Sequence, residues 1–392
     1  MDFLKLAQES KKVYLEYRAG DFLLYALSLI SSGALLHLAF PFPTIQAAIW
    51  PLLLFMALMF VRKHGIRFDP SALSCLAVNL YVYPVQVFQE WALVRFVPLL
   101  LPLSLLFAVA LDDFLESQSV GPAWLSEPLP IWAMVSAHFF VGTCQRLRIH
   151  VAHMKRKDHV REVLIQSVWK KHLGNLSIGW HIHHALVTGI LCQATNLAVP
   201  IATWAVLQPS YRLELILIVL NLGLWRWTRR GHPMNNELVF HRHRSEHRSR
   251  FRFTVLHGHH HDAIPIGTIG AAGVGLLEGF HRTLFHYPLG FGSVAVGLLT
   301  ETGIVLLDMR KHQYVPGVYP FSRGLIRGKV HHAIHHYGSY LPLGTGDGSN
   351  LDRDDAAGYV RNNPKARWLC RMTEQVEGSL DSETSAFLAP ER

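Results

Sequence analysis

Charged residues are scarce in this chain of 392 residues, since Asp, Glu, Lys and Arg together make up only 17% of it. Soluble domains of ordinary composition have about a quarter of their residues charged. Hydrophobic residues make up 50% of the chain, and its mean hydropathy is +0.20. This balance argues against a water-soluble fold of this size and leaves a large soluble helical protein as the weaker alternative.

Cysteine is also scarce, and its spacing excludes two kinds of cross-link. The chain has four cysteines, which lie far apart and form no CxxC pair: Cys75, Cys144, Cys192 and Cys370. Thiolate metal sites and disulfide frameworks both use closely spaced or paired cysteines. Any metal is therefore expected to bind through nitrogen and oxygen atoms.

Three other signatures are absent from the sequence. The chain has no internal repeat, although many membrane transporters are built from repeats. It also has no HExxH motif, in which a general-base Glu lies between the metal-binding histidines of a zinc hydrolase. The first apolar run lacks the small-residue cleavage site of a secretory signal, so we expect it to be retained.

Long apolar runs follow one another along most of the chain. About 20 residues of helix cross a bilayer, and several runs approach this length, although some are short enough to leave the number of crossings open. The runs are 22–40, 45–61, 72–88, 96–111, 131–144, 185–207, 215–225, 263–277 and 288–307. Because lipid leaves no unsatisfied backbone group in place, we predict an all-α, polytopic membrane helix bundle.

The formal net charge of +9 is concentrated in two connections. Residues 146–171 and 226–252 are rich in Lys and Arg, whereas the acidic connection 112–127 contains neither. The positive-inside rule places the two basic connections on the cytoplasmic side, of either a bacterial inner membrane or the endoplasmic reticulum. Anionic lipid headgroups suffice as partners for this charge, so no nucleic acid is expected.

Histidine is abundant, with 25 residues, and three clusters stand out. Residues three or four apart share one face of a helix, which allows their imidazoles to bind one metal ion. The ligand candidates with this spacing are His243, His247, His257, His260, His261, His332, His335 and His336. A tetrahedral site needs four ligands, so this number predicts two metal ions, or one ion with many surrounding imidazoles. Imidazole suits Fe, Zn, Cu and Ni alike.

Other histidines have a simpler interpretation. The Arg- and His-rich stretch 242–252 is also compatible with a helix that binds lipid headgroups. His181, His183 and His184 follow Trp180, and we interpret them as an interfacial cluster rather than as ligands. A last group is expected to face solvent or headgroups: His138, His150, His153, His159 and His172.

The clusters resemble the histidine boxes of the fatty acid hydroxylase and sterol desaturase superfamily of membrane di-iron enzymes. Residues 237–247 are similar to the first box of that superfamily. Leu256-His257-Gly-His259-His260-His261 is similar to the LHGxHH motif of fatty acid 2-hydroxylases. Lys329-Val-His331-His332-Ala-Ile-His335-His336-Tyr337 is similar to their final KxHHxxHH motif. The resemblance covers residues 237–343, about a quarter of the chain.

The sequence departs from the superfamily at two places. When the first box is read from His241, Glu246 stands where the second histidine belongs. In the Leu-Asp-Met-Arg-Lys-His segment that ends at His312, one histidine is displaced, and Pro316 takes the position of its partner. The replacements that we considered for the missing ligands are His281, His286, Glu278 and Asp308.

The resemblance implies an O2-dependent enzyme that hydroxylates a C–H bond of a membrane lipid, or desaturates it, at two Fe ions. Zinc is the expected substitute in purified protein, and a membrane metal-binding protein or transporter is the alternative of another class. His241, His259, His312 and His331 are additional ligand candidates, and Asp262, Asp308 and Glu246 are candidates to orient imidazoles. No HPGG haem motif is present, so we expect a separate cytochrome b5-like or ferredoxin-type electron donor.

The composition divides the chain into three regions. Residues 1–225 form the expected N-terminal transmembrane region, and residues 226–351 form the histidine-box region, predicted to be a cytoplasmic-facing helical cap that holds a di-metal site. Residues 352–392 are expected to be a polar cytoplasmic tail.

Overall fold

The computed structural model describes most of the chain up to residue 315 and a few residues of the C-terminal segment. The described residues are 21–77, 80, 97–119, 121–166, 176–228, 243, 246–247, 250–263, 276–286, 292–312, 315, 367, 370–371, 374–375 and 378. Within these ranges the structure is helical and contains no β-strand, only two isolated bridges. The predicted all-α fold is confirmed for this part of the chain.

The helices follow one another with short connections. They are α2 (Phe22–Ala39), α3 (Pro43–His64), α5 (Val97–Ser117), α6 (Ile131–Lys155), α7 (Lys157–Gln166), α8 (Ile178–Asn196), α9 (Ala198–Leu207), α10 (Tyr211–Thr228), α12 (Arg250–Arg252), α13 (Gly258–Ala263), α14 (Glu278–His286) and α15 (Val294–Lys311). A short 3-10 helix, η1, covers Ala123–Ser126, and a π-helical turn, η3, covers Phe253–His257.

Three helical segments are long and apolar enough to cross a membrane. They are α2, α3 and the combined α8–α9 segment Ile178–Leu207, which have 18, 22 and 30 residues. At a rise of about 1.5 Å per residue, even an 18-residue helix is about 27 Å long, close to the hydrocarbon thickness of a bilayer. The chain therefore has membrane-spanning helices, as its composition predicts.

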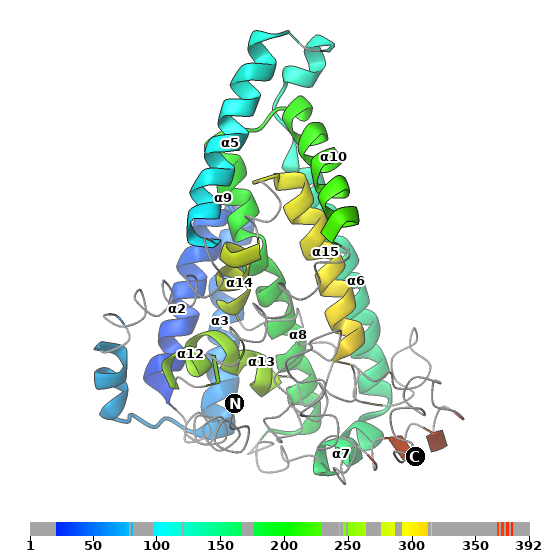
Figure 1. The fold of residues 1–392 in the computed structure, drawn as a ribbon. Helices are drawn as coiled ribbons and strands as arrows, with labels where there is room; N and C mark the ends of the chain where they lie inside the picture. The colour runs from blue at the N-terminus through cyan, green and yellow to red at the C-terminus, as the bar shows by residue number, and fades with distance from the viewer. Residues whose placement is uncertain are drawn as a thin grey trace, which may run out of the picture.

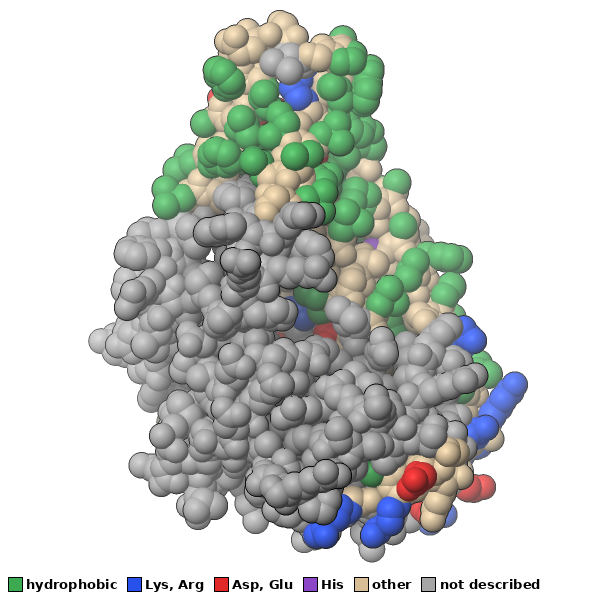
Figure 2. Space-filling model, turned by 45° about the vertical axis from the view of Figure 1, so that its right-hand side comes forward, with side chains coloured by type: hydrophobic (Ala, Val, Ile, Leu, Met, Phe, Trp, Pro, Cys, Tyr) green, Lys and Arg blue, Asp and Glu red, His purple; other side chains and the backbone are tan. Residues whose placement is uncertain are grey.

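The molecule tapers from a broad end to a narrow end (Figure 1). Helices α5 and α10 reach the narrow end, and the short helix α7 lies at the broad end. Hydrophobic side chains cover the visible surface of the narrow part, whereas charged side chains gather at the broad end (Figure 2). Leu106 on α5 and Val219 on α10 are 65% and 67% exposed. Apolar surface of this extent suits contact with lipid.

Helices α6, α8 and α15 pack around a chain of polar contacts. The Nδ1 of His138 lies 2.8 Å from Thr302 Oγ1, and Gln193 Nε2 donates to the backbone oxygen of His138 at 2.8 Å. The buried guanidinium of Arg146 donates to the side-chain oxygen of Gln193. A Cβ on Gly142 would collide with the amide of Gln193, so this close approach of α6 and α8 requires glycine. These contacts fix α8, which passes beside the histidine-rich helices.

A buried carboxylate fixes the start of α15. Glu214 of α10 accepts hydrogen bonds from the Ser293 hydroxyl at 2.6 Å and from the backbone nitrogens of Val294 and Ala295 at 2.8 and 3.1 Å. The first backbone N–H groups of a helix have no partner within the helix, and a carboxylate satisfies them well. This cap sets the position of α15, which carries Glu301, Asp308 and His312.

Several histidines outside the three clusters are buried, contrary to the interpretation that they face solvent or headgroups. His138, His153, His181 and His184 are each at most 2% exposed, because α6 and α8 pack against each other along these positions. His183 is half-buried, and its ring lies near those of Trp180 and His150, as an interfacial cluster would have it. His172 lies outside the described residues.

In the C-terminal segment, Cys370 is 3% exposed and belongs to the main hydrophobic core. At least this residue of the segment that we expected to be a polar tail is therefore packed against the helices.

Candidate metal centre

The second histidine cluster lies on one short helix with an unusual turn. Residues 250–263 form α12, η3 and α13 without interruption, and the backbone N–H of Gly258 bonds to the carbonyl of Phe253, five residues earlier. Such π turns accommodate one extra residue in a helix and are frequent at functional sites. The turn ends at His257, so the histidines that follow it are rotated relative to the beginning of the helix.

Arg250 anchors the beginning of this helix to the start of α2. Its guanidinium lies 2.5 Å from an Asp21 carboxylate oxygen and 2.7 Å from one of Asp69, and it also donates to Ser71 Oγ. Hydrogen bonds from Ser71 and the nearby Arg250 hold the pKa of the Asp69 carboxyl below its usual value. Burial has the larger effect at Asp21, where it raises the pKa of the carboxyl. These contacts place the histidine helix beside α2.

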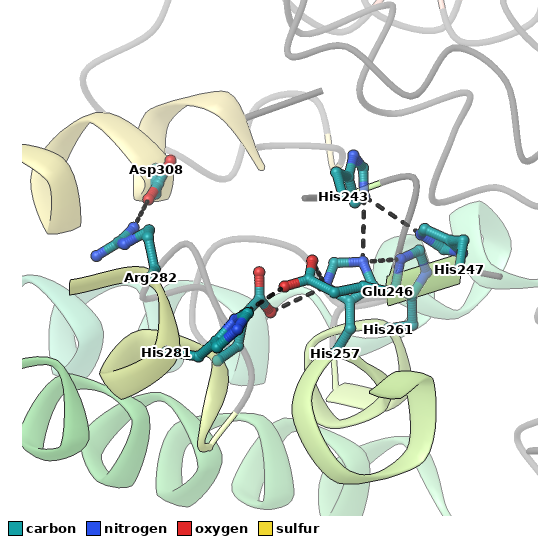
Figure 3. Close-up of polar contacts among 9 residues, drawn as sticks. His243, Glu246, His247, His257, His261, His281, Arg282 and Asp308 are labelled. Carbon is teal, nitrogen blue, oxygen red and sulfur yellow. Dashed lines mark hydrogen bonds and ion pairs between the residues drawn. The ribbon is translucent and has the colours of Figure 1, made fainter. Parts of the chain in front are cut away.

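Four imidazoles from two segments converge on one point. They belong to His243, His247, His257 and His261, whose candidate ligand atoms all lie within 4.8 Å of one another. The Nε2 of His257 lies 3.1 Å from that of His243 and 2.8 Å from that of His261, and the Nε2 of His247 lies 3.2 Å from that of His243. Figure 3 shows His243 and His247 facing His257 and His261. We call these residues the imidazole group.

Hydrogen bonds alone do not account for this arrangement. The Nδ1 of His257 lies 2.8 Å from a carboxylate oxygen of Glu278, so Nδ1 carries the proton and donates it. The Nε2 of a neutral ring with this tautomer has a single lone pair, yet the Nε2 atoms of both His243 and His261 point at it. A metal cation would accept a lone pair from every one of these rings.

The spacing of the nitrogens also fits a metal ion. Metal–nitrogen bonds of about 2.0–2.1 Å separate neighbouring ligand nitrogens by about 3.0–3.4 Å in octahedral or tetrahedral coordination. The separations of 2.8, 3.1 and 3.2 Å in the imidazole group lie close to this range. All four rings are buried, with 5% exposure at most, so water does not compete for their nitrogens. The imidazole group could therefore hold a metal ion.

Two buried glutamates lie behind His257. Glu278, at the start of α14, accepts the hydrogen bond from His257 Nδ1, and Glu246 lies 3.7 Å from the same nitrogen. Glu246 also lies 3.9 Å from His281 Nδ1. A carboxylate bonded to the far nitrogen of a metal-binding histidine fixes its ring and increases its basicity. Glu278 occupies this position, whereas the sequence suggested it as a replacement ligand.

The remaining histidines of the second cluster point elsewhere. The ring of His260 lies 4.9 Å from that of His312, whose Nδ1 donates to the backbone oxygen of Asp308 at 2.7 Å. His259 lies against α2, where its Nε2 donates to Ser28 Oγ at 2.8 Å. His257 and His261 thus share the face that we predicted, while His260 is directed toward His312 and His259 away from the imidazole group.

Asp308 lies apart from the imidazoles. Its carboxylate is 3.8 Å from Arg282, which also forms an ion pair with Glu301 at 2.5 Å. Figure 3 shows Arg282 and Asp308 on one side and the imidazole group on the other. The backbone of Asp308, and not its carboxylate, contacts His312. Glu278, His281 and Arg282 lie three or four residues apart on α14, a spacing that could have indicated this polar face from sequence.

Several predicted ligands fall outside the described part of the chain. They are His241 and the whole third cluster, His331, His332, His335 and His336. The side chains of Asp262 and His286 are likewise outside it. The sequence prediction for these residues stands as made.

Comparisons of the chain with protein-family models, with curated proteins and with solved structures give no match. A function is therefore inferred from the histidine geometry, the apolar helices and the motifs of the sequence.

Proposed function

We propose that this chain is an integral membrane metalloenzyme that uses O2 to hydroxylate a C–H bond of a lipid. The observation that carries the proposal is the convergence of the buried His243, His247, His257 and His261 on one point. Their helix contacts α2 and α8, both of which belong to membrane-spanning segments. A metal held there would lie beside apolar helices that lipid can reach.

The imidazole group would hold one iron ion, and a second would be held by His260 and His312 together with residues of the third cluster. When bound, iron supplies the O2 chemistry that protein side chains cannot perform. Glu278 keeps His257 in the tautomer that presents Nε2 to the metal. Burial of the rings excludes water, which protects a reactive centre from side reactions.

The substrate and the topology follow from the surroundings of the centre. Ser28, which contacts both His259 and the Val255 carbonyl, lies in the second turn of α2, so the centre is near one end of a membrane-spanning helix. We propose a polytopic arrangement with this end on the cytoplasmic side, where a separate cytochrome b5-like or ferredoxin-type donor would supply electrons. A membrane lipid is the expected substrate, because α5 and α10 expose apolar side chains.

Desaturation of the lipid is the alternative reaction at the same centre, and the placement of the substrate carbon decides between the two. Metal binding without catalysis is the alternative of another class, and redox activity separates it from the enzyme.

The proposal is tested by metal content and product analysis of protein purified in detergent. We expect iron bound mainly by nitrogen in X-ray absorption spectra, and 18O from labelled O2 in a lipid product. His247→Ala should lose the iron of the imidazole group and the activity, since its ring is 0% exposed and points into that group. His37→Ala is the matched control, because this histidine is exposed on α2. Full iron content and turnover in His247→Ala would refute the assignment, and redox-inactive metal in the wild type would favour the metal-binding alternative.

A further inference from the structure

A second group of metal-binding atoms adjoins the imidazole group on the far side of His257. Ligand atoms of Glu246, His257 and Glu278 lie within 4.8 Å of one another, and both carboxylates are 1% exposed. His281 is also buried, at 7% exposure, and its Nδ1 points toward Glu246 (Figure 3). Two carboxylates and an imidazole therefore meet between η3 and α14.

The separations in this group are those of atoms that share an ion. Glu246 Oε1 lies 3.9 Å from His281 Nδ1, and Glu246 Oε2 lies 3.7 Å from His257 Nδ1. Both distances are too long for a hydrogen bond. Two ligand atoms that each lie about 2.1 Å from one cation are about 3.0–4.2 Å apart, depending on the angle between them. The separation between Glu246 and His281 fits a cation held between them.

The charge of the two glutamates also calls for a cation. Carboxylates that are close together and shielded from water repel each other, and a bound cation relieves the repulsion. Arg282 lies on the same helix as Glu278 and His281, but its printed ion pairs are with Glu301 and Asp308 of α15. The guanidinium is thus directed to the neighbouring helix.

We propose that Glu246, Glu278 and His281 form a carboxylate-rich site for a divalent cation, separate from the imidazole group. Two oxygen donors and one nitrogen donor favour a hard ion such as Mn²⁺ or Fe²⁺ over the softer ions that an all-imidazole site accepts. His257 joins the two sites, because its Nε2 belongs to the imidazole group and its Nδ1 bonds to Glu278. An ion bound to Glu278 would therefore act on the ligand field of the imidazole group through one ring.

Mn²⁺ binding to the full-length, detergent-purified and chelator-treated chain tests this site. The loss of the free-ion signal in electron paramagnetic resonance reports binding directly and does not depend on enzyme activity. We expect one tight Mn²⁺ per wild-type chain. Glu246→Gln and His281→Asn should each weaken it by at least about tenfold, the smallest loss usual for residues that support a metal site.

Two control variants separate this site from the imidazole group and from general damage. His247→Ala removes a ring of the imidazole group and should change Mn²⁺ affinity by less than about threefold, since His247 contacts no residue of the carboxylate site in the contacts above. Glu301→Gln removes a buried carboxylate that pairs with Arg282, and it should leave Mn²⁺ binding unchanged. Circular dichroism and gel filtration confirm that each variant is folded.

The outcomes distinguish this site from the proposed enzyme. Unchanged Mn²⁺ affinity in both Glu246→Gln and His281→Asn, or no Mn²⁺ binding by the folded wild type, overturns the carboxylate site. If Mn²⁺ binds as expected while the imidazole group takes no iron, the proposed function fails and the carboxylate site stands.

Discussion

The hydrogen bond between Glu278 and His257 offers a quantitative test of how the imidazole group is held. Glu278→Gln preserves the size of the side chain and still presents an oxygen to His257 Nδ1, now 2.8 Å from a carboxylate oxygen. What the substitution removes is the negative charge. Hydrogen bonds to charged groups contribute about 1.5–3 kcal/mol and neutral ones about 0.5–1.5 kcal/mol. The expected loss is therefore about 1–1.5 kcal/mol, or a metal affinity lower by roughly 5- to 13-fold.

Competition between the purified protein and a coloured chelator for Zn²⁺ measures this loss. Glu301→Gln is the matched control: this carboxylate is also buried, at 3% exposure, but it pairs with Arg282 instead of a histidine. Its Zn²⁺ affinity should stay within about twofold of the wild type, although its thermal stability should fall, because it leaves a buried guanidinium without its charged partner. Equal Zn²⁺ affinity in Glu278→Gln and the wild type would show that the carboxylate does not tune His257. A loss of similar size in both variants would show that burial, and not the contact with histidine, is responsible.

Two further predictions concern the helices that position the centre. Gly142→Ala places a Cβ against the amide of Gln193 and should lower stability by about 1–3 kcal/mol, whereas Gly179→Ala, where no atom lies within 4 Å, should not lower it; thermal unfolding in detergent compares them, and equal melting temperatures would contradict the packing argument. Glu214→Ala removes all three hydrogen bonds that cap α15 and should cost about 2–4 kcal/mol in the same assay, with a loss below about 0.5 kcal/mol counting against the cap.

Much of the architecture is accessible from the sequence because it depends on local patterns. Apolar runs of helical length predict the all-α fold and the membrane-spanning helices, and both follow from the physics of lipid. The four-residue spacing of His243 and His247, and of His257 and His261, predicts which rings share a helix face. The structure brings these two pairs together.

Other features depend on which helices pack together, and no local pattern expresses that. Glu278 lies 21 residues from the histidine to which it bonds. His138 and His153 lie beside a basic connection and read as exposed, yet α6 turns them toward α8 and α15. Asp308 stands near a candidate ligand in sequence, but its carboxylate pairs with Arg282.

The π turn at Phe253–His257 gives the centre a dependence on helix winding. Each residue of an α-helix advances the direction of the next side chain by about 100°, so one added residue rotates everything beyond it by that angle. Arg250 lies before the turn and is fixed to Asp21 and Asp69, while His261 lies after it. A chain of the same composition with one residue fewer in this turn would keep the anchor and aim His261 away from His243 and His247. The angle between an ion pair and a metal ligand is thus set by a single residue of winding.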